Sequence, residues 1–136
     1  QGGGVITNVS AIASVRYLGP AAAYMASKGA INSLTVSIAE EYAKYGVRCN
    51  AILPGFMDTP LGLGMYKGPG AEERVRSRNA KLPTGKPGDG WDVAAAAVFL
   101  ASDEAKYING VLLPVDCGWL SAVSYRTYAG GVPWKE

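Results

Sequence analysis

The most regular pattern of hydrophobic and polar positions lies between Ala22 and Gly46. Apolar side chains recur there at steps of three and four residues, which is the spacing of one face of an α-helix. These positions are Ile31, Leu34, Ile38, Tyr42 and Tyr45. Gly46 follows the last of them, and glycine favours the left-handed conformation in which many helices end. The pattern therefore predicts one long helix over residues 22–46.

Short apolar runs precede and follow this helix. Val5–Ser10 is rich in β-branched residues and comes directly after three glycines. Val47–Leu53 is also apolar and stops at the turn dipeptide Pro54-Gly55. A strand, a long helix and a second strand form the pattern of a βαβ unit, whose two strands are parallel.

A long segment rich in glycine and proline, Phe56–Gly90, follows the second strand. Loops of this length inside a compact domain usually serve as functional lids or mobile segments. Within it, the charged stretch Ala71–Lys81 predicts a short helix. We expect this segment to contain the substrate loop of any site built at the end of the second strand.

Two further elements are predicted after the long segment. Trp91–Ser102 reads as a helix, with Asp92 as its N-cap or as an acidic residue of its first turn. Val111–Val115 reads as a third strand, and Pro114 favours a place at an edge of the sheet. The tail at 119–136 shows no clear period.

The order strand, helix, strand, loop, helix, strand predicts an α/β layer fold with a parallel sheet. In open sheets of this kind, ligands bind beyond the carboxyl ends of the strands. Three features meet there: the loop after Ser10, the start of the long helix near Tyr24, and the loop after Pro54. A site is therefore expected at that end of the sheet.

Composition narrows the classes of function. The chain has 136 residues and a net charge of +2, which fits one globular domain. Its basic residues are scattered, so no nucleic-acid or membrane-surface patch is expected. No apolar run has the length of a membrane span and no signal peptide is visible, so a cytoplasmic protein is expected.

The content of histidine and cysteine excludes further chemistry. The chain has no histidine, which removes Ser-His-Asp and Cys-His catalysis and most zinc sites, and no metal is expected. Cys49 lies in a predicted buried strand and is expected to behave as a small hydrophobic residue. Cys117 is far from it in the sequence, and a disulfide between the two is not expected.

Tyr24 and Lys28 stand four positions apart near the start of the long helix. Side chains at this spacing project from the same face of a helix. A phenol alone is a poor base at neutral pH, but a neighbouring ammonium favours its ionised form. The pair therefore suits general acid/base catalysis. An isolated pair of this kind also occurs by chance, with a packed tyrosine and a solvated lysine.

The setting of this Y-x-x-x-K pattern is more specific than the pattern itself. Several short motifs surround it in a fixed order. They are Asn8-Val9-Ser10, Val47-Arg48-Cys49-Asn50-Ala51-Ile52-Leu53-Pro54-Gly55, Asp58-Thr59-Pro60, Val98-Phe99-Leu100-Ala101-Ser102-Asp103, Ile108-Asn109-Gly110 and Val115-Asp116. Together they strongly resemble the C-terminal half of a classical short-chain dehydrogenase/reductase, from about Gly3 to Trp119.

This resemblance implies a fold and an activity. The fold is the C-terminal portion of a single Rossmann-like domain, a doubly wound parallel sheet in three α/β/α layers that is incomplete here. The activity is hydride transfer between NAD or NADP and a small-molecule alcohol or ketone. Members of the family are commonly homodimers or homotetramers, and the long helix often lies in an interface.

The resemblance also assigns roles to residues. Tyr24 is the acid/base, and Lys28 tunes it and binds the ribose next to the nicotinamide. The turn after the second strand flanks the nicotinamide. The cofactor-binding residues implied in this way are Tyr24, Lys28, Pro54, Gly55, Met57 and Thr59. For Met57 and Thr59, an ordinary turn after a strand remains an alternative.

One position departs from the family. The family places a serine after the first strand to hydrogen-bond the substrate carbonyl, and the usual spacing from Tyr24 puts Ala11 there. Three arrangements follow: Ser10 serves instead, Ser14 reaches in, or the hydroxyl is missing. Loss of such a donor typically costs on the order of a hundredfold in rate. Ser10 is the first candidate. Cys117 stands where glycine is usual, which we interpret as a neutral change.

The family's N-terminal half carries its Gly-rich phosphate loop, and that loop is not recognised here. Gly2–Gly4 precedes a strand, whereas a phosphate loop follows one and opens a helix. The chain begins at Gln1, so a fragment that is inactive alone is expected. The alternative to an enzyme is a non-catalytic scaffold or interaction module of the same fold.

Overall fold

A three-stranded parallel sheet forms the centre of the computed structural model, which describes residues 2–121. The strands are β1 (Gly4–Val9), β2 (Val47–Pro54) and β3 (Leu112–Val115), in the order β1-β2-β3. Val9 pairs with Ile52 and Pro54 pairs with Val115, so all three strands end at the same edge of the sheet. The predicted parallel arrangement is confirmed.

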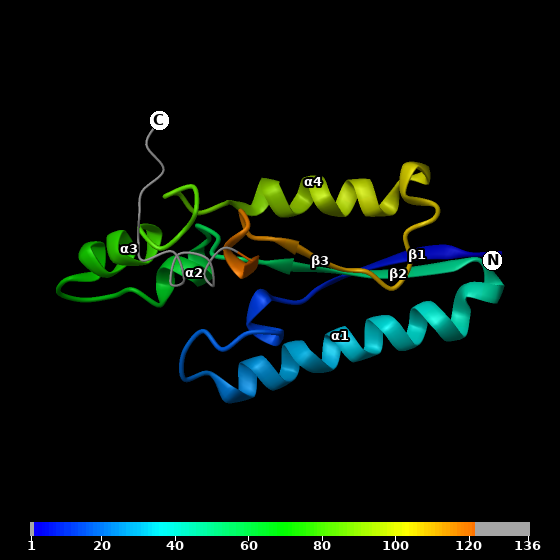
Figure 1. Cartoon of the computed structure of the whole chain (residues 1–136), viewed down its shortest axis with the longest axis horizontal. Helices are drawn as coiled ribbons and strands as arrows, with labels where there is room; N and C mark the ends of the chain where they lie inside the picture. Colours follow the sequence, from blue (N-terminus) through cyan, green and yellow to red (C-terminus); the bar gives the residue numbers. More distant parts are fainter. Residues whose placement is uncertain (1, 122–136) are drawn as a thin grey trace.

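Helices cover both faces of this sheet. Figure 1 shows α1 (Ala22–Tyr42) along one face and α4 (Gly90–Ala101) along the other. A short 3-10 turn, Ala43–Tyr45, continues α1, and Gly46 ends it in the left-handed conformation with a φ of 74°. The fold is therefore the predicted α/β/α arrangement, a Rossmann-like sheet that is incomplete in this chain.

Two shorter helices lie beyond the carboxyl ends of the strands (Figure 1). They are α2 (Pro60–Gly64), which the sequence pattern did not predict, and α3 (Ala71–Asn79), which it did. Leu82, which follows α3, is 2% exposed and joins the core cluster. The segment 56–90 is thus anchored to the domain at its far end.

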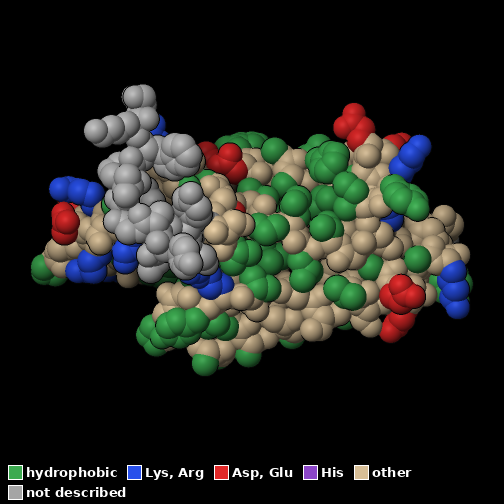
Figure 2. All heavy atoms as spheres, in the orientation of Figure 1, with side chains coloured by type: hydrophobic (Ala, Val, Ile, Leu, Met, Phe, Trp, Pro, Cys, Tyr) green, Lys and Arg blue, Asp and Glu red, His purple; other side chains and the backbone are tan. Residues whose placement is uncertain are grey.

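The core cluster combines residues from the sheet and from the loops at its carboxyl edge. Its members are Ile12, Ala51, Leu53, Leu82 and Trp119. Figure 2 shows hydrophobic side chains gathered over the middle of the molecule, with charged side chains mainly toward its two ends. Along β1, Val5, Ile6 and Val9 remain 39 to 49% exposed. Burying this strand fully would need a further layer or strand beside it.

The apolar stripe predicted on α1 packs only in part, because Ile31 and Ile38 are half-buried while the other three members are exposed. Leu34, Tyr42 and Tyr45 are 54, 47 and 60% exposed. The buried positions of α1 are instead Asn32, Thr35 and Ala39. Their side chains or carbonyls bond to loops and strands, for example Asn8 Nδ2 to Thr35 Oγ1 at 2.9 Å. The fully buried positions of α1 are therefore small residues, two of them polar with remote partners, and not the large apolar residues that the pattern favoured.

The start of α4 also differs from the prediction. Asp89, not Asp92, is the N-cap, and it accepts bonds from the backbone of Trp91 and Asp92. Asp92 is the first-turn acid and accepts from the Asp89 N–H at 2.8 Å, which completes a capping box. Of the two roles proposed for Asp92, the second is correct.

Arg48 ties β2 to the end of α4. Its guanidinium donates to the carbonyls of Leu100, Ser102 and Ile108 at 2.9 to 3.2 Å. The carbonyls of Leu100 and Ser102 lie at the terminus of α4, where backbone acceptors lack partners within the helix, and that of Ile108 lies in the segment before β3. The contact fixes α4 over the sheet.

Cys49 in β2 is fully buried, as predicted, and burial raises the pKa of its thiol. Cys117 is exposed and is the one non-glycine residue among 2–121 with a positive φ, 53°. Both thiols are free.

Among residues 2–121, no helix is long and apolar enough to cross a membrane. The predicted tail lies mostly outside the described residues.

Candidate active site

The site begins with the phenol and the ammonium on the first two turns of α1. Lys28 Nζ lies 5.8 Å from the centre of the Tyr24 ring. Tyr24 is 47% exposed, so its side chain can be reached from solvent. Figure 1 places this end of α1 at the carboxyl edge of the sheet. The helical spacing thus brings the two groups together where the sequence placed the site.

The Lys28 side chain is held in position by β1. Its Nζ donates to the carbonyl of Val9, the last residue of β1, at 3.0 Å. An ammonium has three donors, so two remain for other acceptors. Ser10 completes the connection because its Oγ donates to the Lys28 carbonyl at 3.0 Å. Strand and helix are therefore joined at the residue that carries the positive charge.

The hydroxyls near the expected substrate carbonyl are both donated to the backbone. Ser10 is 3% exposed and bonds to Lys28 as above. Ser14 donates to the Ala11 carbonyl at 2.6 Å and accepts from Asn32 Nδ2 at 2.7 Å. Ala11 is 7% exposed and has no hydroxyl to offer. Either serine would have to give up a backbone bond to donate to a substrate.

The turn after β2 requires glycine at position 55. A Cβ built on Gly55 would lie 2.7 Å from Cβ of Asp116 and 2.8 Å from its Cα, which is too close for any side chain. The Gly55 N–H donates to the Val115 carbonyl at 2.9 Å. Pro54 and Gly55 are therefore fixed against the end of β3, and this fixes the direction in which the chain continues.

The next residues pair with the end of the long segment. Met57 forms an isolated parallel bridge with Gly88, and the Asp58 N–H donates to the Gly88 carbonyl at 2.8 Å. Thr59 caps α2 by accepting from the Gly62 N–H at 3.1 Å. That bond uses a lone pair, so the Thr59 hydroxyl keeps a proton to donate elsewhere. Residues 54–59, called the 54–59 turn below, are held at both ends.

Together these groups place several hydrogen-bonding functions beyond the carboxyl ends of the strands. The exposed Tyr24 phenol, the two spare donors of Lys28 and the hydroxyl of Thr59 are hydrogen-bonding groups at the same edge of the sheet. Among residues 2–121, no three His, Cys, Asp or Glu side chains gather to hold a metal ion.

Arg78 of α3 is a buried residue that the sequence did not single out. It is 5% exposed, and its Nη2 lies 2.8 Å from Oδ1 of Asp58. In the sequence it belongs to a run that also contains Arg74 and Arg76, which reads as a solvated charged face. Its pairing depends on Asp58, twenty positions earlier, so no local pattern identifies it.

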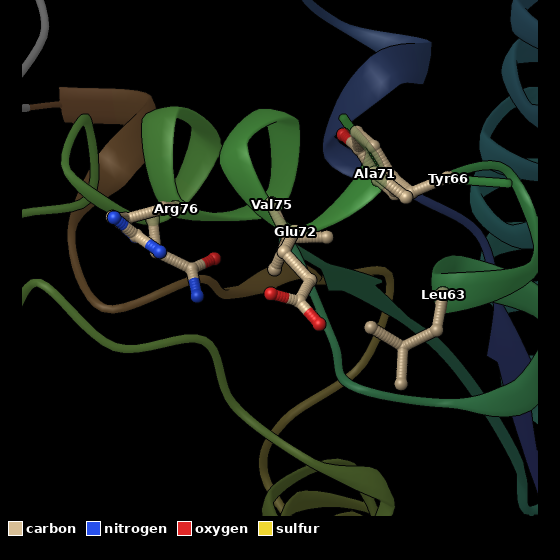
Figure 3. Close-up of a pocket in the computed structure, with 7 residues that line it drawn as sticks. Leu63, Tyr66, Ala71, Glu72, Val75 and Arg76 are labelled. Carbon is tan, nitrogen blue, oxygen red and sulfur yellow. The ribbon is translucent and has the colours of Figure 1, made fainter. Parts of the chain in front are cut away.

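A pocket of about 390 Å³ lies between α2 and α3. Figure 3 shows residues of α3 on one side of it, with Leu63 of α2 on the other. Its lining residues are Leu63, Tyr66, Ala71, Glu72, Val75, Arg76 and Asn79. All belong to the predicted substrate segment, and none is Tyr24 or Lys28.

The chain matches the family model described as enoyl-(acyl carrier protein) reductase over residues 1–120. Among curated relatives, a 2,5-dichloro-2,5-cyclohexadiene-1,4-diol dehydrogenase of Sphingobium indicum is 40% identical over 119 residues. These residues are 88% of this chain and 46% of the relative. A 3beta-hydroxysteroid dehydrogenase of Eggerthella lenta is 42% identical over 85% of this chain and 43% of its own length.

Solved structures of dehydrogenases and reductases also match this chain over about half of their own length. Levodione reductase superposes with a TM-score of 0.82 and 30% identity, over 85% of this chain and 46% of that one. A structure described as an NAD(P)-dependent gluconate 5-dehydrogenase from Beutenbergia cavernae, with bound NADP, has a TM-score of 0.82 and 38% identity. It is matched over 88% of this chain and 47% of its own. The chain thus spans about half the length of the relatives it matches.

Proposed function

Because the chain belongs to the short-chain dehydrogenase/reductase family, we propose that the full-length protein is an NAD(P)-dependent oxidoreductase acting on an alcohol or ketone. The observation that carries this proposal is the pair formed by Tyr24 and Lys28 at the carboxyl end of β1. The nicotinamide, when bound, takes up or supplies the hydride. The residues of this chain transfer the proton and orient the cofactor and the substrate.

Tyr24 is the acid/base in this proposal. During alcohol oxidation, its ionised oxygen would take the hydroxyl proton of the substrate, while the carbon that bears this hydroxyl gives up its hydride to the cofactor. During ketone reduction, its O–H gives that proton to the forming alkoxide. Lys28 is proposed to tune Tyr24, since its Nζ lies 5.8 Å from the centre of the Tyr24 ring. Since Val9 holds one of its donors, the other two can reach Tyr24 or the ribose.

The 54–59 turn is proposed to hold the nicotinamide. Pro54 and Gly55 place the backbone against the end of β3, and Thr59 has a hydroxyl proton to donate. Met57 supplies an apolar surface between them. Asp58 and Gly88 close the turn by a backbone hydrogen bond, which keeps these groups in place before a ligand binds.

Ser10 is the first candidate for the hydroxyl that polarises the substrate carbonyl. In that role it would exchange its bond to the Lys28 carbonyl for one to substrate. The hydroxyls of Ser10 and Ser14 already donate to backbone carbonyls. This favours the second candidate function, a scaffold that keeps the fold without turnover. Dinucleotide binding without any ketone-dependent oxidation would distinguish the scaffold from the enzyme.

The outward face of α1 supports a proposed homodimer or homotetramer. Leu34 and Tyr42, about two turns apart on one side of this helix, are 54 and 47% exposed. Apolar side chains at such positions are typical of a helix that packs against another copy. Light scattering of the full-length protein and of a Leu34→Glu variant would test this, because a charge at a helix interface should dissociate the assembly.

The central test is Tyr24→Phe in the full-length protein. Oxidation of NADH or NADPH would be followed with a panel of ketones, and dinucleotide binding would be measured separately. We expect turnover to fall by about a thousandfold or more, with dinucleotide affinity changed by less than about tenfold. Tyr45→Phe, at the other end of the same helix, is the matched control. Undiminished turnover in Tyr24→Phe would refute the role.

A further inference from the structure

Arg78 is buried within residues 56–90, the segment that the sequence predicts to contain the substrate loop. Only 5% of its surface is exposed, although it lies in a helix whose other arginines face solvent. Arg76, two positions earlier, pairs with Glu73, and both side chains are more than 70% exposed. Removing a guanidinium from water is costly unless partners compensate for it. The partners of Arg78 are therefore the feature to explain.

Those partners come from the turn beside the proposed cofactor site. The guanidinium pairs with the Asp58 carboxylate at 2.8 Å and lies 5.3 Å from the centre of the Phe56 ring. Phe56 and Asp58 flank Met57, and Asp58 precedes Thr59. Phe56 also contacts Trp119 of the core, with ring centres 4.8 Å apart. Arg78 thus attaches α3 to the 54–59 turn and, through it, to the core.

The same guanidinium supports two walls of the pocket between α2 and α3. Its Nε donates to Asn79 Oδ1 at 2.9 Å, and the Tyr66 ring centre is 5.3 Å away. Tyr66 and Asn79 both line that pocket, whereas Arg78 itself does not. Any displacement of Arg78 would therefore move the pocket walls and the 54–59 turn together.

We propose that Arg78 is a positioning residue that, through Asp58, fixes the substrate pocket relative to the nicotinamide-binding turn. This inference rests on the proposed function. It assigns Arg78 no contact with the reacting atoms. Its effect is on binding, because Tyr24 and Lys28 stand on α1 and share no contact with the Arg78 guanidinium.

The test is steady-state kinetics of the full-length protein, with NADH or NADPH and the ketone that it reduces best. The variants are Asp58→Asn, which keeps the size of the side chain, and Arg78→Met. We expect the KM values for dinucleotide and ketone to rise roughly tenfold or more in each variant, because small displacements of binding groups have effects of that order. We expect kcat per folded enzyme to change by less than about threefold.

Two further variants separate positioning from general stability. Lys81→Met removes an exposed positive charge just after α3, outside the pocket lining, and should leave both KM values unchanged. Arg78→Lys keeps a charge near Asp58 but loses the planar fork, and it should give intermediate KM values. A purely structural role would lower the active fraction and thus kcat, with KM unchanged. Unchanged KM in Asp58→Asn would overturn the inference.

Amide hydrogen exchange measures the coupling between Arg78 and the 54–59 turn without any need for turnover. Backbone amides of residues 56–59 should exchange roughly tenfold faster in Asp58→Asn and Arg78→Met than in the wild type and Lys81→Met. Equal exchange rates would overturn the inference even in an active enzyme. If the wild type turned over no ketone, the proposed function would fail, while faster exchange in these variants would still support the coupling.

Discussion

The Ser10 hydroxyl donates to the backbone carbonyl of Lys28 across 3.0 Å, so the end of β1 is bonded to the residue that carries the site's ammonium. A second hydrogen bond joins the same two elements, since Lys28 Nζ donates to the carbonyl of Val9. The two bonds hold the first turns of α1 against the carboxyl edge of the sheet. The position of Tyr24 therefore depends on this pair of contacts as well as on the helix itself.

Replacing Lys28 should affect both charge and position. In Lys28→Met the bond to Val9 and the positive charge beside Tyr24 are lost, while the length of the side chain is nearly kept. We expect kcat/KM of the full-length protein to fall by about a hundredfold or more. Lys44→Met, in the last turn of the same helical segment, is the control. An unchanged kcat/KM in Lys28→Met would contradict the assigned role.

The serine departure can be tested by adding the hydroxyl back. We expect Ala11→Ser to raise kcat by about tenfold or more if a missing donor limits the reaction. In that case Ser10→Ala removes only a bond within the scaffold, and it should cost about 1 kcal/mol of unfolding free energy with a smaller effect on kcat. A loss of about a hundredfold in Ser10→Ala, with stability retained, would instead give Ser10 the substrate-binding role.

The fold was largely predictable because its elements depend on local pattern. The strands and α1 begin or end within one residue of the predicted bounds, apart from the 3-10 turn that follows α1. Turn chemistry at Pro54 and Gly55 and the left-handed Gly46 are equally local signals. The helical spacing of Tyr24 and Lys28 fixed their proximity, since it follows from geometry alone.

What the sequence could not predict depends on partners remote along the chain. Thr35 is buried against the sheet, where it accepts a hydrogen bond from Asn8. The periodicity of α1 does not predict that contact. Arg78 differs from Arg76 only in that Asp58 and Phe56 lie beside it in space. In both cases a polar residue is buried by a tertiary interaction, and local hydrophobicity favours the opposite assignment.

The 136-residue chain alone should bind dinucleotide poorly. Val5, Ile6 and Val9 of β1 are 39 to 49% exposed, and β1 is an edge strand among the described residues. Exposed apolar edges promote association between chains. We expect self-association in analytical ultracentrifugation and no binding of NADH or NADPH in fluorescence titrations below about 1 mM, a Kd that corresponds to about −4.1 kcal/mol. Tight binding by the isolated chain would show that it is sufficient for the site.

The two cysteines should respond differently to pH and to alkylation. Burial raises the pKa of Cys49, and a hydrogen bond with Thr35 offsets part of that rise. In the unfolded chain the thiol has its ordinary pKa of about 8.5 and loses its proton first. The resulting stability is therefore fully present below about pH 8.5 and decreases as the pH rises toward the pKa of the folded protein.

Urea unfolding between pH 7 and pH 10 would measure this effect, at roughly 1.4 kcal/mol per pH unit at most. The comparison is between Cys117→Ser and Cys117→Ser/Cys49→Ala, so that no disulfide can form. We expect the unfolding free energy to decrease more steeply with pH when Cys49 is present. In the native wild type, iodoacetamide should modify the exposed Cys117 rapidly and Cys49 only after unfolding. Parallel pH profiles for the two variants would show that the thiol is equally solvated in the folded and unfolded states.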